Sequence, residues 1–312
     1  MASGNESRSC ESEGPRVERL RVSPQIYARQ QPRHAGPRRL HTLSFPIDRP
    51  YLPAATGAYR NRFGVTDGTN IHVVDFDTRQ VHDFIHRDQI VERTSVEPSL
   101  TSMAVRHTDV YLLDSASGSL LHKKRDRFEV RAQLTGIENP ISIHSLDGER
   151  FAVRGSNGLF ALEQGHATLR ISPERLVGPG CREQALAIRT DGFLAQVRTC
   201  GTETVLHLGS VSSGELRPVV RFDGPEGVAA GDMTFALTPA SSNGMYCLFG
   251  TRLSYVTFDG DIAGIEVSPP IPDRFAMSPK AIAESFTGDL IVVGPEGLLV
   301  LTPVNASEAR MP

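Results

Sequence analysis

The chain alternates short apolar runs with polar turns, and the apolar runs come in pairs. Each pair consists of an apolar strand that ends in Val or Phe, a polar turn and a second apolar strand. The six pairs are 62–65 with 71–74, 103–105 with 110–113, 151–153 with 159–162, 193–197 with 205–208, 245–249 with 253–256, and 290–293 with 298–301. From Val65 to Val293, the last apolar residue of each first strand advances in steps of 40, 48, 44, 52 and 44 residues. This period is typical of four-stranded propeller blades, so the pattern predicts an all-β, six-bladed β-propeller.

The two ends of the chain fit a ring that is closed by a terminal strand. The last repeat has three predicted strands, near 281–285, 289–293 and 297–302, and is therefore one strand short. Strand-like alternation begins at Leu40, before the first repeat, so we expect residues near 40–46 to enter the last blade as its missing strand. The predicted organisation is an N-terminal tail over 1–38, a propeller over 39–305 and a C-terminal tail over 306–312.

The repeats place the chain in a known architectural class. The span from about 40 to 304 resembles the six-bladed β-propellers, the superfamily that contains NHL-like, TolB-like and gluconolactonase-like members. The resemblance is to the architecture and to no single family. Gluconolactonase-like enzymes carry a metal-binding glutamate in an early Glu-Gly-Pro motif. The nearest strings in this chain are 224–227 and 294–297, which have the wrong order and place, so the metal site is not carried over.

Composition excludes several partners. The formal net charge of -3 gives no electrostatic reason to bind nucleic acid, and no apolar stretch reaches the roughly 18 residues of a transmembrane helix. Arginine and lysine together number 33, and lysine occurs only at 123, 124 and 280. We attribute this bias to the codon usage of a bacterial genome.

Two of the four cysteines are predicted to meet across a hairpin. If Asp191 and Gly192 form a two-residue turn, opposed residues sum to 383, and Cys181 and Cys200 sum to 381. The two thiols then lie within about one residue pair of each other, close to disulfide distance; the alternative is two free thiols. With a disulfide, and a leader removed upstream, the protein would be periplasmic or extracellular, and otherwise cytoplasmic.

Catalytic motifs are missing from the sequence. It contains no Gly-x-Ser-x-Gly elbow, no phosphate-binding Gly-rich loop and no His-Glu-x-x-His helix. His82 and His86 are four residues apart, but on a strand this spacing separates them by about 13 Å, too far to share a metal. The sequence therefore predicts no catalytic residues, no metal and no cofactor.

A recurring Val-Arg pair gives the most specific binding prediction. We expect the two runs of each pair to be the second and third strands of a blade. Three successive repeats then end their second strand in Val-Arg, and their arginines should lie at equivalent heights on one face of the ring. The predicted ligand-binding residues, with two possible extensions, are Arg106, His107, Arg154, Arg198 and Arg252. Guanidinium groups suit carboxylate, phosphate or sulfate ligands. The alternative is that strand ends are polar simply because they meet water.

Two functions remain open from the sequence. The first is a non-enzymatic binding or scaffold module that recognises a protein partner or a small anionic ligand on its loop face. The second is a metal-dependent lactonase-like or lyase-like enzyme. An enzyme needs acidic or histidine side chains on the strands that line the central channel, and the segments expected there, such as 141–143, 185–188 and 281–283, contain almost none. This shortage favours the binding module.

Overall fold

The structure is a computed structural model. The residues that it describes are 36–43, 56–59, 62–66, 71–75, 80–85, 100–106, 109–124, 127–240, 244–273, 281–284, 288–294 and 297–304.

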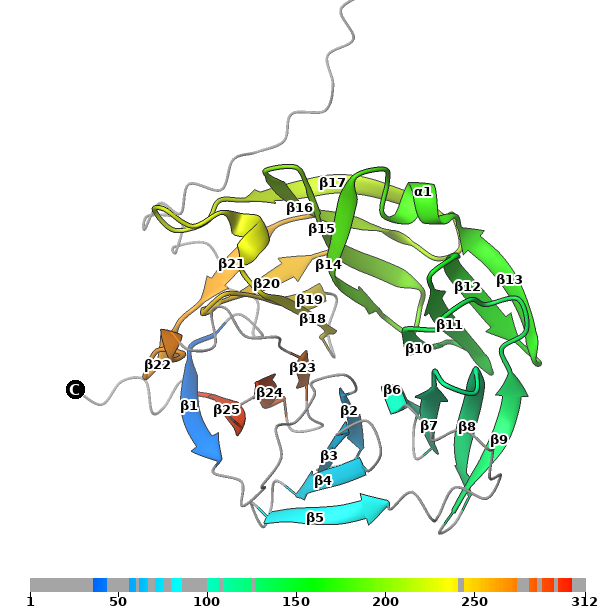
Figure 1. Cartoon of the computed structure of the whole chain (residues 1–312). Coiled ribbons are helices and arrows are strands. Elements are labelled where there is room, and N and C mark those ends of the chain that lie inside the picture. Colours follow the sequence, from blue (N-terminus) through cyan, green and yellow to red (C-terminus); the bar gives the residue numbers. More distant parts are fainter. Residues whose placement is uncertain are drawn as a thin grey trace, which may run out of the picture.

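The described strands form an all-β propeller (Figure 1). Five sheets have four antiparallel strands each, and one sheet has five strands. Helix is restricted, in the described residues, to the single turn α1 (Pro173–Leu176) and short 3-10 segments such as η4 (Ala230–Asp232). The predicted propeller fold is confirmed.

Each sheet begins with three strands that follow one another in the chain. The first strands are β2 (Thr56–Tyr59), β6 (Leu100–Arg106), β10 (Ser142–Leu146), β14 (Cys181–Ile188), β18 (Phe235–Pro239) and β23 (Ala281–Glu284). The second strands are β3 (Arg62–Thr66), β7 (Asp109–Asp114), β11 (Arg150–Gly155), β15 (Phe193–Cys200), β19 (Gly244–Phe249) and β24 (Leu290–Gly294). The third strands are β4 (Ile71–Asp75), β8 (Ser119–Lys124), β12 (Gly158–Glu163), β16 (Glu203–Ser210), β20 (Arg252–Thr257) and β25 (Gly297–Pro303).

The outer strands distinguish the regular blades from the closing sheet. In the four-stranded sheets they are β5 (Gln80–Ile85), β9 (Arg127–Gln133), β13 (His166–Ile171), β17 (Glu215–Phe222) and β21 (Ile262–Ile265). In the five-stranded sheet they are β1 (Arg38–Leu43) and β22 (Val267–Ser268). We number the regular blades 1 to 5 in chain order, so that β10–β13 are blade 3, β14–β17 are blade 4 and β18–β21 are blade 5.

First strands line the centre of the ring. Each of them contacts the first strand of the next sheet, and β2 contacts β23, so the circle is closed. The side chains between sheets are mostly apolar. One cluster, for example, joins Val197 and Leu206 of blade 4 to Phe235 and Phe249 of blade 5. These contacts explain why the apolar runs of the sequence are apolar on both faces: each blade is packed between two neighbours.

The closing sheet contains the predicted N-terminal strand. Strand β1 pairs antiparallel with β25, from Arg38 opposite Pro303 to Leu43 opposite Leu298. The prediction that an N-terminal strand completes the last repeat is confirmed. The prediction of six equivalent blades is not confirmed. Five blades are regular four-stranded sheets, whereas the closing sheet has an additional strand, β22, which pairs parallel with β1. The extra strand covers the edge that β1 would otherwise expose.

A buried arginine fixes the closing strand. The Arg38 side chain is 3% exposed and donates hydrogen bonds to the carbonyl oxygens of Gly288 (2.8 Å) and Leu301 (3.1 Å). It also donates to the Tyr246 hydroxyl in blade 5 (3.0 Å), which in turn donates to Glu284 Oε1 (3.2 Å). Burial lowers the pKa of Arg38, and burial followed by the charge of Glu284 raises the pKa of Tyr246. The N-terminal strand is therefore anchored to two sheets.

The second predicted repeat is displaced by one strand. The runs 103–105 and 110–113 were expected to be second and third strands, but they lie in β6 and β7, the first and second strands of blade 2. Both strands of any blade hairpin are apolar, so the pattern cannot distinguish a first strand from a second. Arg106 therefore ends a first strand, whereas Arg154 and Arg198 lie near the ends of second strands. Because adjacent strands are antiparallel, Arg106 is at the opposite edge of the ring from the other two.

Candidate functional site

The predicted arginine cluster is divided by the fold. Arg106 lies at the far edge of the ring because it ends a first strand, and His107 lies outside the described residues. Arg252 begins β20 and is exposed, at the edge where second strands end. Arg154 and Arg198 lie at that same edge, in blades 3 and 4. Arg154 is buried and bonds to blade 4, whereas Arg198 is partly exposed and bonds to the α1 connection, so the two do not share an open face.

Arg154 connects blade 3 to blade 4. Its side chain is 6% exposed, and its Nε donates to Glu183 Oε2 in blade 4 at 3.3 Å. Its Nη1 donates to the carbonyl oxygens of Gly155 and Gly158. Three of its donor interactions are thus already made within the protein, so Arg154 positions Glu183 and the loop after β11.

Glu183 lies on the innermost strand of its blade, near the end where second strands terminate. Its Oε2 accepts a second hydrogen bond, from Gln196 Nε2 at 2.7 Å. The Glu183 side chain keeps 19% of its surface exposed. Both of these contacts are made to the same oxygen, so the carboxylate is held in one orientation while part of it reaches solvent.

These groups belong to a larger polar layer on one face of blade 4. Glu183 is paired with Arg198 and Gln196 with His207, and residues 196 and 198 lie on the same side of β15. Leu194, which shares that side, packs against Ala152 and Leu159 of blade 3. We call Arg154, Glu183, Gln196, Arg198 and His207 the polar layer; it lies between blades 3 and 4.

The polar layer contains two buried atoms with unmet hydrogen-bonding capacity. Gln196 is fully buried, and its Oε1 has no hydrogen-bond partner among the described residues. The same holds for Arg198 Nε. Native proteins rarely leave such groups unpaired, because each costs about 1–3 kcal/mol. The layer is therefore more polar than inter-blade packing requires.

Burial keeps the histidines near the site neutral. Burial, and then the charge of Arg198, lowers the pKa of His207 to about 4. Burial also lowers the pKa of His144 to about 4; this residue is on the innermost strand β10, where its Nε2 lies 3.1 Å from Ser142 Oγ. Burial likewise lowers the pKa of Arg198. Both imidazoles are uncharged near neutral pH.

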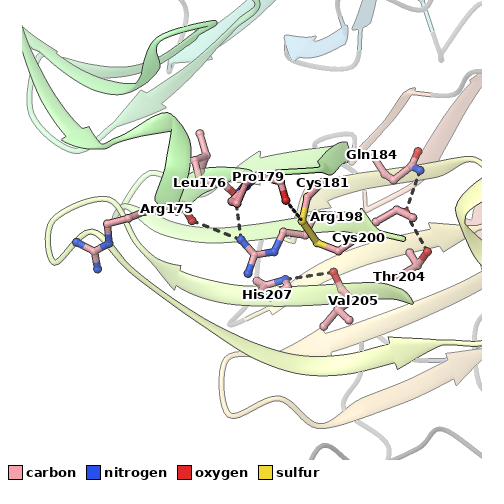
Figure 2. Close-up of a disulfide and its surroundings, with 11 residues drawn as sticks. Arg175, Leu176, Pro179, Cys181, Gln184, Arg198, Cys200, Thr204, Val205 and His207 are labelled. Carbon is pink, nitrogen blue, oxygen red and sulfur yellow. Dashed lines mark hydrogen bonds between the residues drawn. A yellow bond between two sulfur atoms is a disulfide. The ribbon is translucent and has the colours of Figure 1, made fainter. Parts of the chain in front are cut away.

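A disulfide fixes the strand that carries Glu183, and Figure 2 shows its surroundings. The predicted bond between Cys181 and Cys200 is present, and the two cysteines are directly opposed in the β14–β15 ladder. The predicted two-residue turn at Asp191 and Gly192 is wrong by one residue: Arg189 bonds to Phe193, so opposed residues in the regular part of the ladder sum to 382 rather than 383. The register shift between Glu183 and Ala185 lowers the sum by one more, to the 381 of Cys181 and Cys200. This irregularity is the bulge that aligns the two sulfur atoms.

Two loops are attached beside the disulfide. Arg198 Nη1 donates to the carbonyl oxygens of Arg175 and Leu176 in α1, at 3.4 Å each (Figure 2). Arg182 Nη2 and Gln184 Nε2 both donate to the Gly231 carbonyl oxygen in η4, at 2.6 and 2.9 Å. The connection before blade 4 is thus held by the end of β15, and the one after blade 4 by the start of β14, at the same end of the hairpin.

The sequence reasoning missed the ionisable residues of the innermost strands. His144 and Glu183 lie on first strands, outside the segments that were expected there. Glu284 lies inside the strand predicted near 281–285, but it was not recognised as an ionisable residue of the ring centre. The first strands extend beyond the apolar runs by which they were predicted. The usable signal for Glu183 was the cysteine pair itself, because pairing Cys181 with Cys200 forces β14 to begin at 181.

The described residues do not form a metal site of the kind expected for a metal-dependent propeller enzyme. Within them, no group of three or more His, Cys, Asp or Glu side chains is placed to hold an ion. At Glu183, the Arg154 guanidinium already neutralises the carboxylate at 3.3 Å and would repel a cation. In addition, no helix of the described part is long and apolar enough to cross a membrane.

Comparisons with known proteins confirm the architecture. No family model and no curated protein sequence matches the chain. Among solved structures, a gluconolactonase from Xanthomonas campestris aligns with a TM-score of 0.60 at 11% identity, over 85% of this chain and 89% of that one. A streptogramin B lyase aligns with a TM-score of 0.56 at 11% identity, over 84% and 97%. A chain of the mitotic checkpoint complex gives 0.54 at 13% identity, over 87% and 96%. At these identities the likeness shows the fold alone: this chain is a β-propeller.

Proposed function

We propose that this propeller is an enzyme that acts on a small molecule, of the lactonase or lyase type, with Glu183 as its proton-transfer group. The observation that supports this proposal is the placement of Glu183. Its partly exposed carboxylate lies on an innermost strand and is oriented by Arg154 and Gln196. A general acid or base requires a titratable group in a fixed orientation within reach of a bound molecule. The similar solved structures include a gluconolactonase and a streptogramin B lyase, which supports this class over a pure scaffold.

The arrangement assigns a role to each member of the polar layer. Arg154 and Gln196 hold Glu183 Oε2, so its other oxygen is directed to the substrate. The unpaired Gln196 Oε1 and Arg198 Nε are an acceptor and a donor on one side of β15. Both atoms are buried, so we assign Gln196 and Arg198 to orienting Glu183 within the layer rather than to contact with the substrate. No step in this scheme passes through a metal ion, because Arg154 occupies the charged side of Glu183.

The test is an activity screen with a matched pair of variants. Purified protein is assayed against aldonolactones and other cyclic esters, with acid release and ring opening as readouts. Glu183→Gln is expected to lose activity by about 10²-fold or more, because the amide cannot transfer a proton. Glu226→Gln, in an exposed loop of the same edge, should retain it. Full activity in Glu183→Gln, with unchanged thermal unfolding, would contradict the assignment.

A second candidate is a binding module without catalysis. It is favoured by the absence of a metal-ligand cluster from the described residues, and similar propellers occur in the mitotic checkpoint complex and in a nidogen/laminin complex. The predicted anion-binding role of Arg154, Arg198 and Arg252 belongs to this candidate. It predicts that sulfate or phosphate stabilises the wild type and not a triple alanine variant, and that Glu183→Gln changes no reaction.

We propose an oxidising compartment, the periplasm or the extracellular space, as the location. The support is the Cys181–Cys200 disulfide, because disulfides persist in oxidising compartments and are rare in the cytosol. Mass spectrometry of the protein from its native source, with free thiols blocked at lysis, tests this. Blocked thiols at both positions would contradict it.

A further inference from the structure

The end of the innermost strand of blade 4 is separated from the rest of its ladder by a register shift. The β14–β15 ladder is irregular between Glu183 and Ala185, so residues 181–183 form a three-residue segment beyond the irregularity. Short segments at strand ends open readily, because few backbone hydrogen bonds resist the gain in chain entropy. Only three backbone pairs hold this segment to β15, so its side-chain attachments contribute to keeping it closed.

Three side-chain attachments meet in this short segment. The disulfide joins its first residue, Cys181, to Cys200. Arg182 is bonded to the Gly231 carbonyl oxygen, and Glu183 to Arg154 and Gln196. The disulfide is the only covalent one of the three, and it also ends the connection that contains α1, since Cys181 directly follows that loop.

The disulfide is accessible from solvent, unlike the third described cysteine. Cys181 and Cys200 are both partly exposed, whereas Cys247 is 1% exposed, and burial raises its pKa to about 12. A thiolate must reach a disulfide sulfur for exchange to occur, and Cys247 is a free thiol with no S–S bond for a reductant to cleave. Among the described cysteines, only the Cys181–Cys200 pair can therefore respond to a reductant.

We propose that the Cys181–Cys200 disulfide is a redox lock on Glu183, which opens when a dithiol reductant cleaves it. The reductant gives up two electrons and two protons and becomes a disulfide, and the S–S bond of the protein becomes two thiols. Residues 181–183 and the α1 connection are then held only by non-covalent contacts. Glu183 loses its fixed orientation against Arg154. This regulation rests on the proposed function of Glu183, but the opening itself does not.

Hydrogen exchange measured by mass spectrometry tests the opening without any substrate. Oxidised protein is compared with protein in dithiothreitol, with peptides that cover 172–184, 198–203 and, as an internal reference, 150–163. On reduction, amides of the first two peptides should exchange about tenfold faster or more, and those of the reference should not change. Unchanged exchange in all three peptides would overturn the lock.

Cysteine variants separate the lock from general reduction effects. The double variant Cys181→Ser/Cys200→Ser should show the fast exchange in both conditions, whereas Cys247→Ala should respond to dithiothreitol like the wild type. If the double variant fails to fold, reduction of the wild type still gives the result. A response to dithiothreitol that persists in the folded double variant would overturn the proposal.

Activity separates this proposal from the previous one. If the oxidised enzyme is active and reduction lowers its activity at least tenfold and reversibly, both proposals are supported. If activity survives reduction and hydrogen exchange stays slow, the redox lock is contradicted and the proposed enzymatic function is not. If reduction speeds hydrogen exchange but neither state is active, the opening is supported and the proposed enzymatic function is contradicted.

Discussion

The sheet of blade 4 has two faces that are built on different principles. Its face toward blade 5 is apolar, with Val197 and Leu206 fully buried against Phe235 and Phe249. Its face toward blade 3 carries the polar layer at one end. Both faces occupy the same kind of position between two blades, so the polar layer is not explained by the need to pack a propeller.

The difference shows where stability and function are separated in this fold. Apolar packing gains about 25 cal/mol for each Å² that is removed from water and needs no directional partners. The polar layer instead contains a charged pair and two unpaired buried atoms, at a cost that apolar residues of similar size would avoid. The apolar face therefore holds the ring together, whereas the polar face contains the residues of the proposed site.

The largest effect is expected from the apolar face. Leu206→Ala should lower the free energy of unfolding by about 3–5 kcal/mol, because it leaves a cavity at a fully buried site. Urea unfolding followed by circular dichroism measures it. Leu169→Ala, at a leucine on β13 that is 49% exposed, should change it by less than about 0.5 kcal/mol. Equal losses in the two variants would contradict the assignment of stability to the apolar face.

The covalent link of the polar face comes next. Replacing both Cys181 and Cys200 by Ser should cost about 3 kcal/mol, the value expected when a loop of about 20 residues is released in the unfolded chain. Differential scanning calorimetry of the oxidised wild type and the double variant measures the loss. An unchanged unfolding temperature would mean that the disulfide contributes no stability.

The charged pair of the polar face should contribute less. Arg154→Met leaves the Glu183 carboxylate without its cation, and the expected loss is about 2 kcal/mol, reduced from the fully buried case because Glu183 is partly exposed. Arg150→Met serves as the control, since Arg150 lies on the same strand and is exposed. A control variant that is destabilised as much as Arg154→Met would show that the loss does not come from the pair.

The smallest expected effect is a dependence on pH. The pKa of His207 is about 6.5 in the unfolded chain and is lowered to about 4 in the folded protein. Between about pH 6.5 and about pH 4, the unfolded chain therefore binds a proton that the folded protein does not. The free energy of unfolding should therefore fall by about 1–2 kcal/mol between about pH 7 and pH 5 because of this residue. His144 has a similar pKa, so His207→Gln should lose about half of the combined dependence. An identical pH dependence in wild type and variant would contradict the burial of His207 as the cause.

The regular part of the fold could be predicted because it depends on local patterns. Paired apolar runs with turn residues between them specify hairpins, and their period specifies blades. The position of the closing strand also followed from the count of strands at the two ends. The order of the strands in blade 2 could not be predicted, because its first and second strands are equally apolar. Arg106 was therefore placed on a second strand, at the wrong edge of the ring.

The site could be predicted only where covalent chemistry constrained it. The cysteine pair was found from strand register, and its bulge was needed to complete the geometry. Glu183 was missed because it precedes the apolar run of β14, and a polar residue at a strand end has the same appearance as a loop residue. The contacts of Arg154 and Arg198 depend on partners in other strands and loops, which no local pattern contains.

By itself, the sequence determined that this chain is a β-propeller, that its N-terminal strand completes the last sheet and that Cys181 and Cys200 can form a disulfide. These properties follow from periodicity and register, which are short-range features of the chain. Only the tertiary structure decided that Arg154 reaches Glu183 in the next blade and that the two faces of blade 4 differ. The partners of such contacts between blades are determined by how the sheets pack, rather than by the sequence around each residue.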